Sequence, residues 1–168
     1  MSNDILVITE HLNGKVADIS YEMVGKAKAL ASMLGGQAIV ALLGSGMSAQ
    51  ASTFASDKTI YVDDPALAQF NPEAYGKVIS QLIATHTPRL TLFGSSSMGM
   101  DVASWLSAKT GNACAAYVKD LSAAGGEITA TCQVYAGKAL VEAVPGGNAI
   151  ALILAGSFPA DAGRGTTS

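Results

Sequence analysis

Short apolar runs alternate with longer amphipathic stretches over the first two thirds of the chain. Buried strands are predicted where four such runs of apolar and β-branched residues are bounded by turn residues, at 5–9, 38–43, 59–62 and 90–93. An amphipathic helix is predicted from Asp18 to Leu34, because apolar residues recur there about every 3.6 positions. A second helix is predicted from Pro72, after the capping residue Asn71, as far as Pro88. This alternation predicts a parallel sheet with helices on both faces.

Smaller elements complete the first part of the pattern. Residues 10–15 are expected to be a loop with Asn13-Gly14 as its turn, and residues 47–56 a short alanine-rich helix. The helix after the strand at 90–93 is expected to begin at about Met100.

The last third of the sequence changes to mostly β structure. Extended segments are predicted at 113–118, 127–135, 139–144 and 149–154, the first two joined by a hairpin turn at 122–126. We expect these late strands to extend the edge of the sheet, partly in antiparallel orientation. The predicted fold class is therefore α/β, a three-layer α/β/α arrangement with a mostly parallel, Rossmann-like sheet. Residues 1–158 are predicted to form a single domain, followed by a flexible tail at 159–168.

The loop after the strand at 90–93 is the leading candidate for a ligand site, because parallel sheets bind ligands at the carboxyl ends of their strands. No lysine or arginine lies between Arg89 and Lys109, and the loop is neither a P-loop nor a GxGxxG motif. Asp101 is expected in the first helical turn, where it would already satisfy the helix dipole. A structural turn and a small-ligand or partner contact both remain open. The candidate residues are Gly94, Ser95, Ser96, Ser97, Gly99 and Asp101.

Catalytic chemistry is not predicted. Glu10 and His11 lie near the serine-rich loop, but no serine has the GxSxG setting of a hydrolase nucleophile. His86 falls on an apolar helix stripe, where histidines commonly pack or cap.

Composition narrows the choice of partner. Charged residues make up 14% of the 168 residues, the net charge is −3, and the basic residues are scattered, which argues against nucleic acid. The longest apolar run, 149–155, is too short to span a membrane, and no signal peptide is visible, so a cytoplasmic location is expected.

Cys114 and Cys132 are expected to be buried free thiols, and no metal site is predicted. Tyr135 and Lys138 interrupt an apolar strand region and predict an edge or partner interface.

Several segments taken together resemble one family. They recur in a single order: ILVITEH at 5–11, VDDPAL at 62–67, TPRLTLFGSSSMGMD at 87–101, VYAGKAL at 134–140 and AGSF at 155–158. This order is similar to the N-terminal domain of the electron transfer flavoprotein alpha subunit, over about Ile5 to Phe158. The sequence departs from the family's pattern at Met100 and Leu154, where the family usually has arginines.

The resemblance implies an adenine-nucleotide-alpha-hydrolase-like fold that pairs with a beta subunit and serves mainly as a docking scaffold. It implies that FAD is held by a second, C-terminal alpha domain, to which nothing here corresponds, and AMP by the beta subunit. No cofactor is therefore expected in this chain unless that domain or a partner supplies it. The predicted function is a non-catalytic docking component in electron transfer, with a beta-like subunit or a second copy as partner. The alternative is a stand-alone module that binds AMP or ATP with the loops at the carboxyl ends of the strands.

Overall fold

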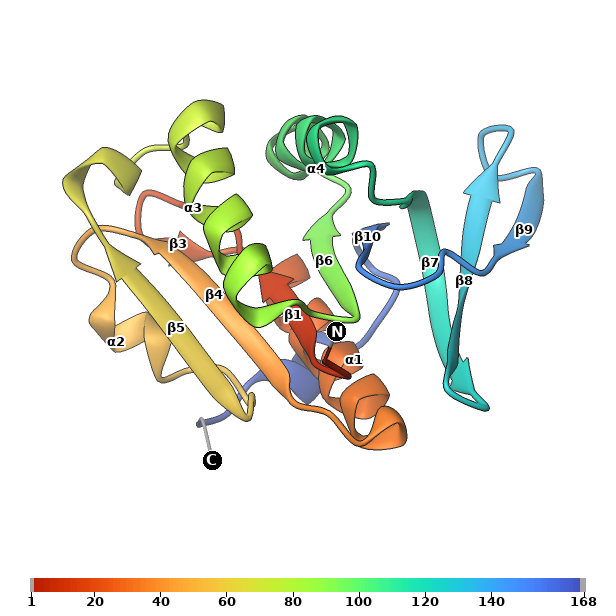
Figure 1. The fold of residues 1–168 in the computed structure, drawn as a ribbon. Coiled ribbons are helices and arrows are strands. Elements are labelled where there is room, and N and C mark those ends of the chain that lie inside the picture. The colour runs from red at the N-terminus through yellow and green to blue at the C-terminus, as the bar shows by residue number, and fades with distance from the viewer. Residues whose placement is uncertain (1, 167–168) are drawn as a thin grey trace.

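Eight strands of the computed structural model form one sheet within residues 2–166, the part of the chain that the structure describes. They are β1 (Ile5–Ile8), β4 (Ala38–Gly44), β5 (Lys58–Asp63), β6 (Leu90–Gly94), β7 (Cys114–Ala124), β8 (Glu127–Val134), β9 (Ala139–Ala143) and β10 (Ala149–Ile153). Their order across the sheet is β5-β4-β1-β6-β10-β7-β8-β9 (Figure 1). The strands from β5 to β7 are parallel, whereas β8 and β9 add antiparallel pairs at one edge.

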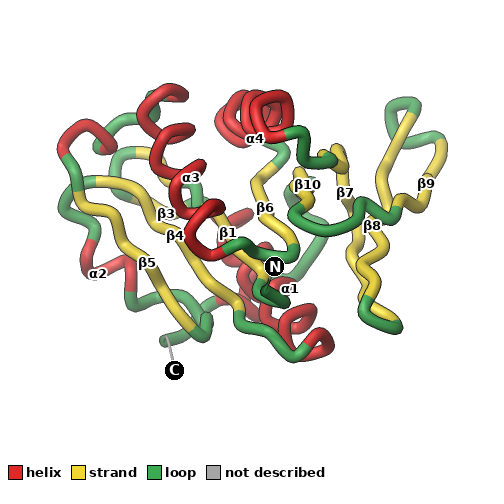
Figure 2. Tube along the Cα trace, in the orientation of Figure 1, coloured by secondary structure: helices red, strands yellow, loops and turns green. Residues whose placement is uncertain are grey.

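Helices cover both faces of this sheet, as Figure 2 shows. They are α1 (Asp18–Leu34), α2 (Ser48–Ala51), α3 (Pro72–His86) and α4 (Ser97–Thr110), with 3-10 turns η1 (Pro65–Leu67) and η2 (Ala160–Gly163). Successive side chains of a strand point to opposite faces. Ile5 and Val7 accordingly pack in the core under α1, and Leu6 and Ile8 in the core under α3 and α4. The predicted three-layer α/β/α fold is confirmed.

Local signals place most helix ends close to their predicted positions. The Asn71 side chain accepts hydrogen bonds from the backbone N–H groups of Glu73 and Ala74, which fixes the start of α3 at Pro72. Helix α1 ends at Leu34, with Gly35 as its left-handed cap. The helix predicted over 47–56 is a single turn, α2.

The segment expected to be a loop at 10–15 contains a small hairpin instead. Strands β2 (His11–Leu12) and β3 (Lys15–Val16) pair antiparallel. Asn13 and Gly14 join them with φ values of 51° and 76°, the left-handed pair that a tight hairpin turn requires.

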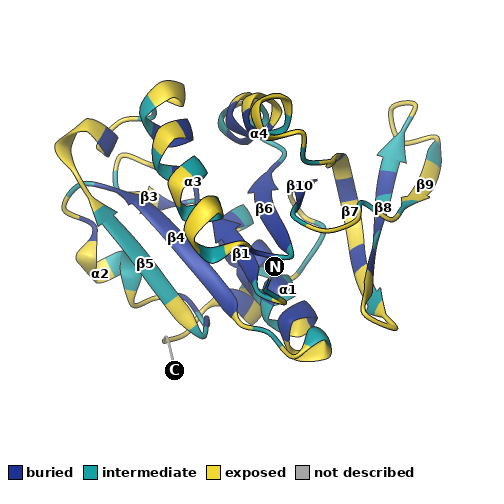
Figure 3. Cartoon of the chain, in the orientation of Figure 1, coloured by how far each residue is buried: buried dark blue, intermediate teal, exposed yellow. Residues whose placement is uncertain are grey.

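The expectation that all the late strands lie at the sheet edge is wrong for β10. It inserts between β6 and β7 and runs parallel to both, so only β8 and β9 extend the edge. All five residues of β10 are buried, and Figure 3 shows β6 buried beside it. An entirely apolar strand needs neighbours and cover on both sides, which only the middle of the sheet supplies.

The tail that we expected to be flexible is docked over residues 159–166. Turn η2 packs against α1, where Gly163 closely approaches the backbone carbonyl of Tyr21. Arg164 Nη2 donates to Asp18 Oδ1 at 2.7 Å, and its guanidinium lies 4.0 Å from the centre of the Tyr21 ring. Residues 167 and 168 lie outside the described residues.

Candidate functional site

The serine-rich loop after β6 is built as a helix cap. Ser96 is the N-cap of α4, and its Oγ accepts a hydrogen bond from the backbone N–H of Gly99 at 3.0 Å. Helix α4 therefore begins at Ser97, three residues earlier than predicted. Asp101 lies beyond the first turn and is exposed, so the expectation that it satisfies the helix dipole is wrong.

The carboxyl group beside this helix start belongs to Glu10, which follows β1. Ser96 Oγ donates to Glu10 Oε1 at 2.7 Å, and only 9% of Glu10 is exposed. A Cβ atom on Gly94 would lie 2.6 Å from Glu10 Oε1, and one on Gly99 would lie 3.1 Å from it. The two glycines thus make room for the Glu10 carboxyl. The Glu10 carboxyl therefore lies beside the start of α4 and hydrogen-bonds to its capping serine.

Burial raises the pKa of the Glu10 carboxyl above the ordinary 4.5, and the hydrogen bond from Ser96 opposes this only in part. A carboxyl whose pKa is raised by folding stabilises the fold fully below its unfolded pKa and loses that contribution as the pH rises through the folded pKa. The variant Glu10→Gln is therefore expected to be more stable than the wild type at pH 7. The difference should vanish below about pH 4.5.

Urea denaturation at a series of pH values measures this difference directly. Glu127→Gln is the matched control, because Glu127 is exposed at the β7–β8 turn and its replacement should leave the pH dependence unchanged. A Glu10→Gln protein less stable than the wild type at pH 7 would show that the ionised carboxyl is needed at the cap.

His11 is buried next to Glu10 but faces other groups. Its Nε2 lies 2.8 Å from the Leu43 carbonyl oxygen and 3.2 Å from the hydroxyl of Tyr75. The Tyr75 hydroxyl donates to the Leu67 carbonyl at 3.0 Å. These contacts tie the imidazole to β4 and α3, and no serine hydroxyl hydrogen-bonds to it within residues 2–166. The structure offers no nucleophile–base pair around this histidine.

Two spaces flank Glu10, and only one has room for a small molecule. The inner one is an apolar cavity of about 20 Å³ between Glu10, Phe93 and Tyr75, too small for a ligand. The outer one is a groove of about 380 Å³, within the range of ligand pockets. Its lining includes Lys15 and Met98, which the sequence did not single out.

The predicted loop residues are thus brought together, but as a cap and not as the lining of the outer groove. Gly94 and Gly99 are buried, Ser97 and Asp101 are exposed, and the Ser95 hydroxyl is buried without a hydrogen-bond partner in the described part of the chain. Met100, where the related family usually has arginine, packs partly buried against the α3–α4 core.

The other predicted site lies on the arm, which we define as β7, β8, β9 and the turns between them, residues 114–143. Tyr135 and Lys138 both belong to the β8–β9 turn and are exposed, Tyr135 to 80%. Figure 1 shows this turn projecting at the β9 end of the sheet. A groove of about 640 Å³ runs beside it, with Tyr117, Tyr135 and Leu154 in its lining. Cys114, expected to be buried, is exposed at the start of the arm, whereas Cys132 is buried as expected; both are free.

Comparison with known proteins identifies the family. The family model described as "Electron transfer flavoprotein domain" matches residues 5–168, nearly the whole chain. The chain belongs to the electron transfer flavoprotein domain family. The resemblance to the alpha subunit is confirmed by curated relatives, most of which are named as alpha subunits of electron transfer flavoproteins.

Three of these alpha subunits show how far the likeness extends. The subunit from Methylophilus methylotrophus is 31% identical over 89% of this chain and 48% of its own length. The Bacillus subtilis subunit is 25% identical over 83% of the chain and 43% of its own length. The Thermoanaerobacterium thermosaccharolyticum subunit is 32% identical over 60% of the chain and 31% of its own length. This electron transfer flavoprotein domain therefore spans about a quarter to a half of the length of the curated relatives that it matches.

None of the helices that the structure describes is long and apolar enough to cross a membrane. In the same part of this electron transfer flavoprotein domain, no cluster of three or more His, Cys, Asp or Glu side chains is arranged to hold a metal ion.

Proposed function

We propose that this chain is a non-catalytic docking component of an electron transfer flavoprotein system, and that it binds a beta-like subunit through the arm. The observation that carries the proposal is the groove beside Tyr135, whose aromatic lining is exposed at the end of the sheet. Tyrosine is enriched among the residues that dominate binding energy at protein interfaces. The naming of its relatives as subunits supports a role within an assembly.

The same proposal assigns flavin binding to another domain or to the partner. It is supported by the Glu10 carboxyl, which accepts a hydrogen bond from the N-cap Ser96 and so places an acidic group beside the start of α4, where a phosphate would have to bind. A visible absorption spectrum of the purified chain checks this assignment. Flavin bands that survive gel filtration would overturn it.

The arm is tested by replacing Tyr135 with serine. The immobilised chain is incubated with an extract of its source cells, and the bound electron transfer flavoprotein beta subunit is quantified by mass spectrometry. We expect the wild type to retain the beta subunit and Tyr135→Ser to lose it at least about tenfold, as for an interface aromatic whose truncation costs upwards of ~1.4 kcal/mol.

Leu12→Ser is the matched control, since Leu12 is 71% exposed on the β2–β3 hairpin, away from the arm. Equal losses in the two variants would place the binding surface elsewhere. No beta subunit on the wild type would remove the docking role.

A second candidate function rests on the outer groove at Glu10. Its volume of about 380 Å³ and its Lys15 support a small nucleotide-binding module with AMP or ATP as ligand. A ligand that binds only the folded protein must raise its melting temperature. A thermal-shift screen with AMP, ATP and FAD therefore decides this alternative, and Lys15→Ala should abolish any shift that arises in this groove.

A further inference from the structure

Strand β9 leaves one edge of the sheet open. It pairs with β8 through five register positions, and no other strand of the described chain lies on its far side. Backbone N–H and C=O groups of alternate residues therefore point away from the sheet without a strand to receive them. Figure 3 shows β9 largely exposed, in contrast to the buried strands at the centre of the sheet.

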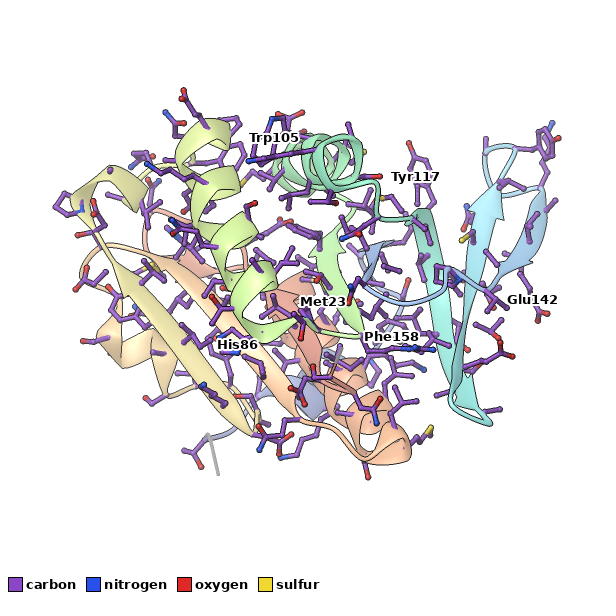
Figure 4. The ribbon with its side chains drawn as sticks, viewed as in Figure 1. Met23, His86, Trp105, Tyr117, Glu142 and Phe158 are labelled. Carbon is purple, nitrogen blue, oxygen red and sulfur yellow. The ribbon has the colours of Figure 1, made fainter. Side chains whose placement is uncertain are left out.

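Charged side chains normally protect such an edge from joining another strand. Here the two charges are opposite in sign and stand at equal distances from Leu140, which is 60% exposed. Lys138 lies two residues before Leu140 and Glu142 two residues after it. Leu140 and Glu142 are alternate residues of β9, so their side chains point to the same face. Lys138 is the last residue of the β8–β9 turn, directly before the strand. Neither charge forms an ion pair with another residue between positions 2 and 166. Figure 4 shows Glu142 at the outer margin of the arm, directed away from the rest of the protein.

This spacing makes the edge complementary to itself in one orientation only. Two copies of β9 can pair antiparallel with Leu140 opposite Leu140. When this pairing continues one residue past Ala139 into the turn, Lys138 of each copy stands opposite Glu142 of the other. A parallel, in-register pair would set Lys138 against Lys138 and Glu142 against Glu142, and like charges directly opposite are destabilising. The charges therefore select a two-fold symmetric pairing, as a closed homodimer requires.

The apolar positions of β9 fit the same register. Val141, 49% exposed, would face Ala139 of the second copy, and the small alanine lets the backbones approach. On the β8 side Val141 stands opposite Cys132, which is already buried. Pairing would thus continue an existing apolar face across the junction.

We propose that the chain forms a homodimer through antiparallel pairing of β9 with β9 of a second copy, in the register centred on Leu140. The pairing joins two eight-stranded sheets into one. This inference goes beyond the proposed docking role of the arm: it uses the β9 edge and leaves the groove beside Tyr135 to the flavoprotein partner.

Charge reversal tests the register with the purified chain alone. Sedimentation velocity is measured over the widest concentration range that solubility allows. We expect a concentration-dependent dimer for the wild type. Lys138→Glu and Glu142→Lys should each raise the dimer dissociation constant at least tenfold, because each variant sets like charges opposite each other twice.

Mixing the two variants restores complementarity, because each contact between positions 138 and 142 then joins a glutamate of one variant to a lysine of the other. The mixture should therefore dimerise as the wild type does. Glu127→Lys is the matched control: it makes the same charge change at the β7–β8 turn, off the β9 edge, and should leave dimerisation unchanged. Circular dichroism confirms that each variant is folded.

A wild type that stays monomeric at every concentration overturns the inference. So does a dimer that tolerates both single reversals, or one that the mixture does not restore. Failure here is separate from failure of the proposed function: a monomer that still captures the beta subunit keeps the docking role, and a dimer that captures none keeps the β9 pairing.

Discussion

Replacing Gly99 with alanine is expected to lower the free energy of unfolding by about 2 kcal/mol or more, the cost of overpacking a site that cannot relax. A Cβ on Gly99 would collide with the carbonyl oxygen of Gly94, the last residue of β6, and would press on Glu10 Oε1. Backbone cannot swing aside as a flexible side chain can, so α4 would have to move away from the sheet. For a domain of this length the melting temperature should fall by roughly 4–8 °C.

The expected loss of stability in Gly99→Ala is informative, because helix propensity alone predicts a gain. Alanine is favoured over glycine in a helix by about 1 kcal/mol. Ser104→Ala, on the exposed face of α4, keeps the propensity gain without the collision and should be neutral or slightly stabilising. Thermal unfolding followed by circular dichroism compares the two variants. A Gly99→Ala protein as stable as the wild type would mean that the close contact between α4 and β6 is not needed.

The elements of the fold were predictable where the signal is local. Apolar runs between turn residues located the strands, a 3.6-residue periodicity located the first helix, and Asn71 with Pro72 located the start of α3 to the residue. The place of β10 was not predictable in this way. Its five apolar residues show that it is buried, but the order of strands in a sheet depends on which crossovers pack, and no short stretch of sequence records that.

The sequence predicts that the candidate loop caps a helix, but not which acidic side chain lies beside the cap. Ser96 and Gly99 have the spacing of a capping serine and the N–H that it receives. That the acid beside them is Glu10, and not Asp101, depends on β1 and β6 lying side by side, 86 residues apart in the chain at this contact. The self-complementary spacing of Lys138, Leu140 and Glu142 was present in the sequence, but it acquires meaning only once β9 is known to be the edge strand.

One residue of the sequence, Glu22, indicates that the tail is docked against α1. Glu22 interrupts the apolar face of α1 and is only 6% exposed. Its two carboxylate oxygens accept the backbone N–H of Gly156 at 3.0 and 2.9 Å, and Oε2 also accepts the N–H of Phe158 at 3.2 Å. An acid within an otherwise apolar helix stripe implies a buried donor that the acid satisfies. Here the donors are the backbone of the segment after β10, so this one side chain links α1 to the end of the chain.

Replacing Glu22 with alanine is accordingly expected to cost about 3–5 kcal/mol of stability, the largest effect that we predict. Two N–H groups would lose charge-assisted hydrogen bonds, and each buried donor left unpaired costs about 1–3 kcal/mol. Glu22→Gln should lie between the alanine variant and the wild type. Its single carbonyl oxygen can still accept from Phe158, but its NH₂ group would then face the N–H of Gly156.

The segment that leads to η2 should also unfold locally before the whole domain unfolds, because Glu22 holds this segment against α1. Hydrogen exchange measured by mass spectrometry should show faster exchange from 155 to 164 in Glu22→Gln under conditions where the sheet strands remain protected. Glu73→Gln, exposed in the first turn of α3, is the control for loss of a carboxylate and should change neither exchange nor melting by more than a small amount. If Glu22→Ala had the same melting temperature as Glu73→Gln, the contacts of Gly163 and Arg164 with α1 would be sufficient by themselves to dock the segment after β10.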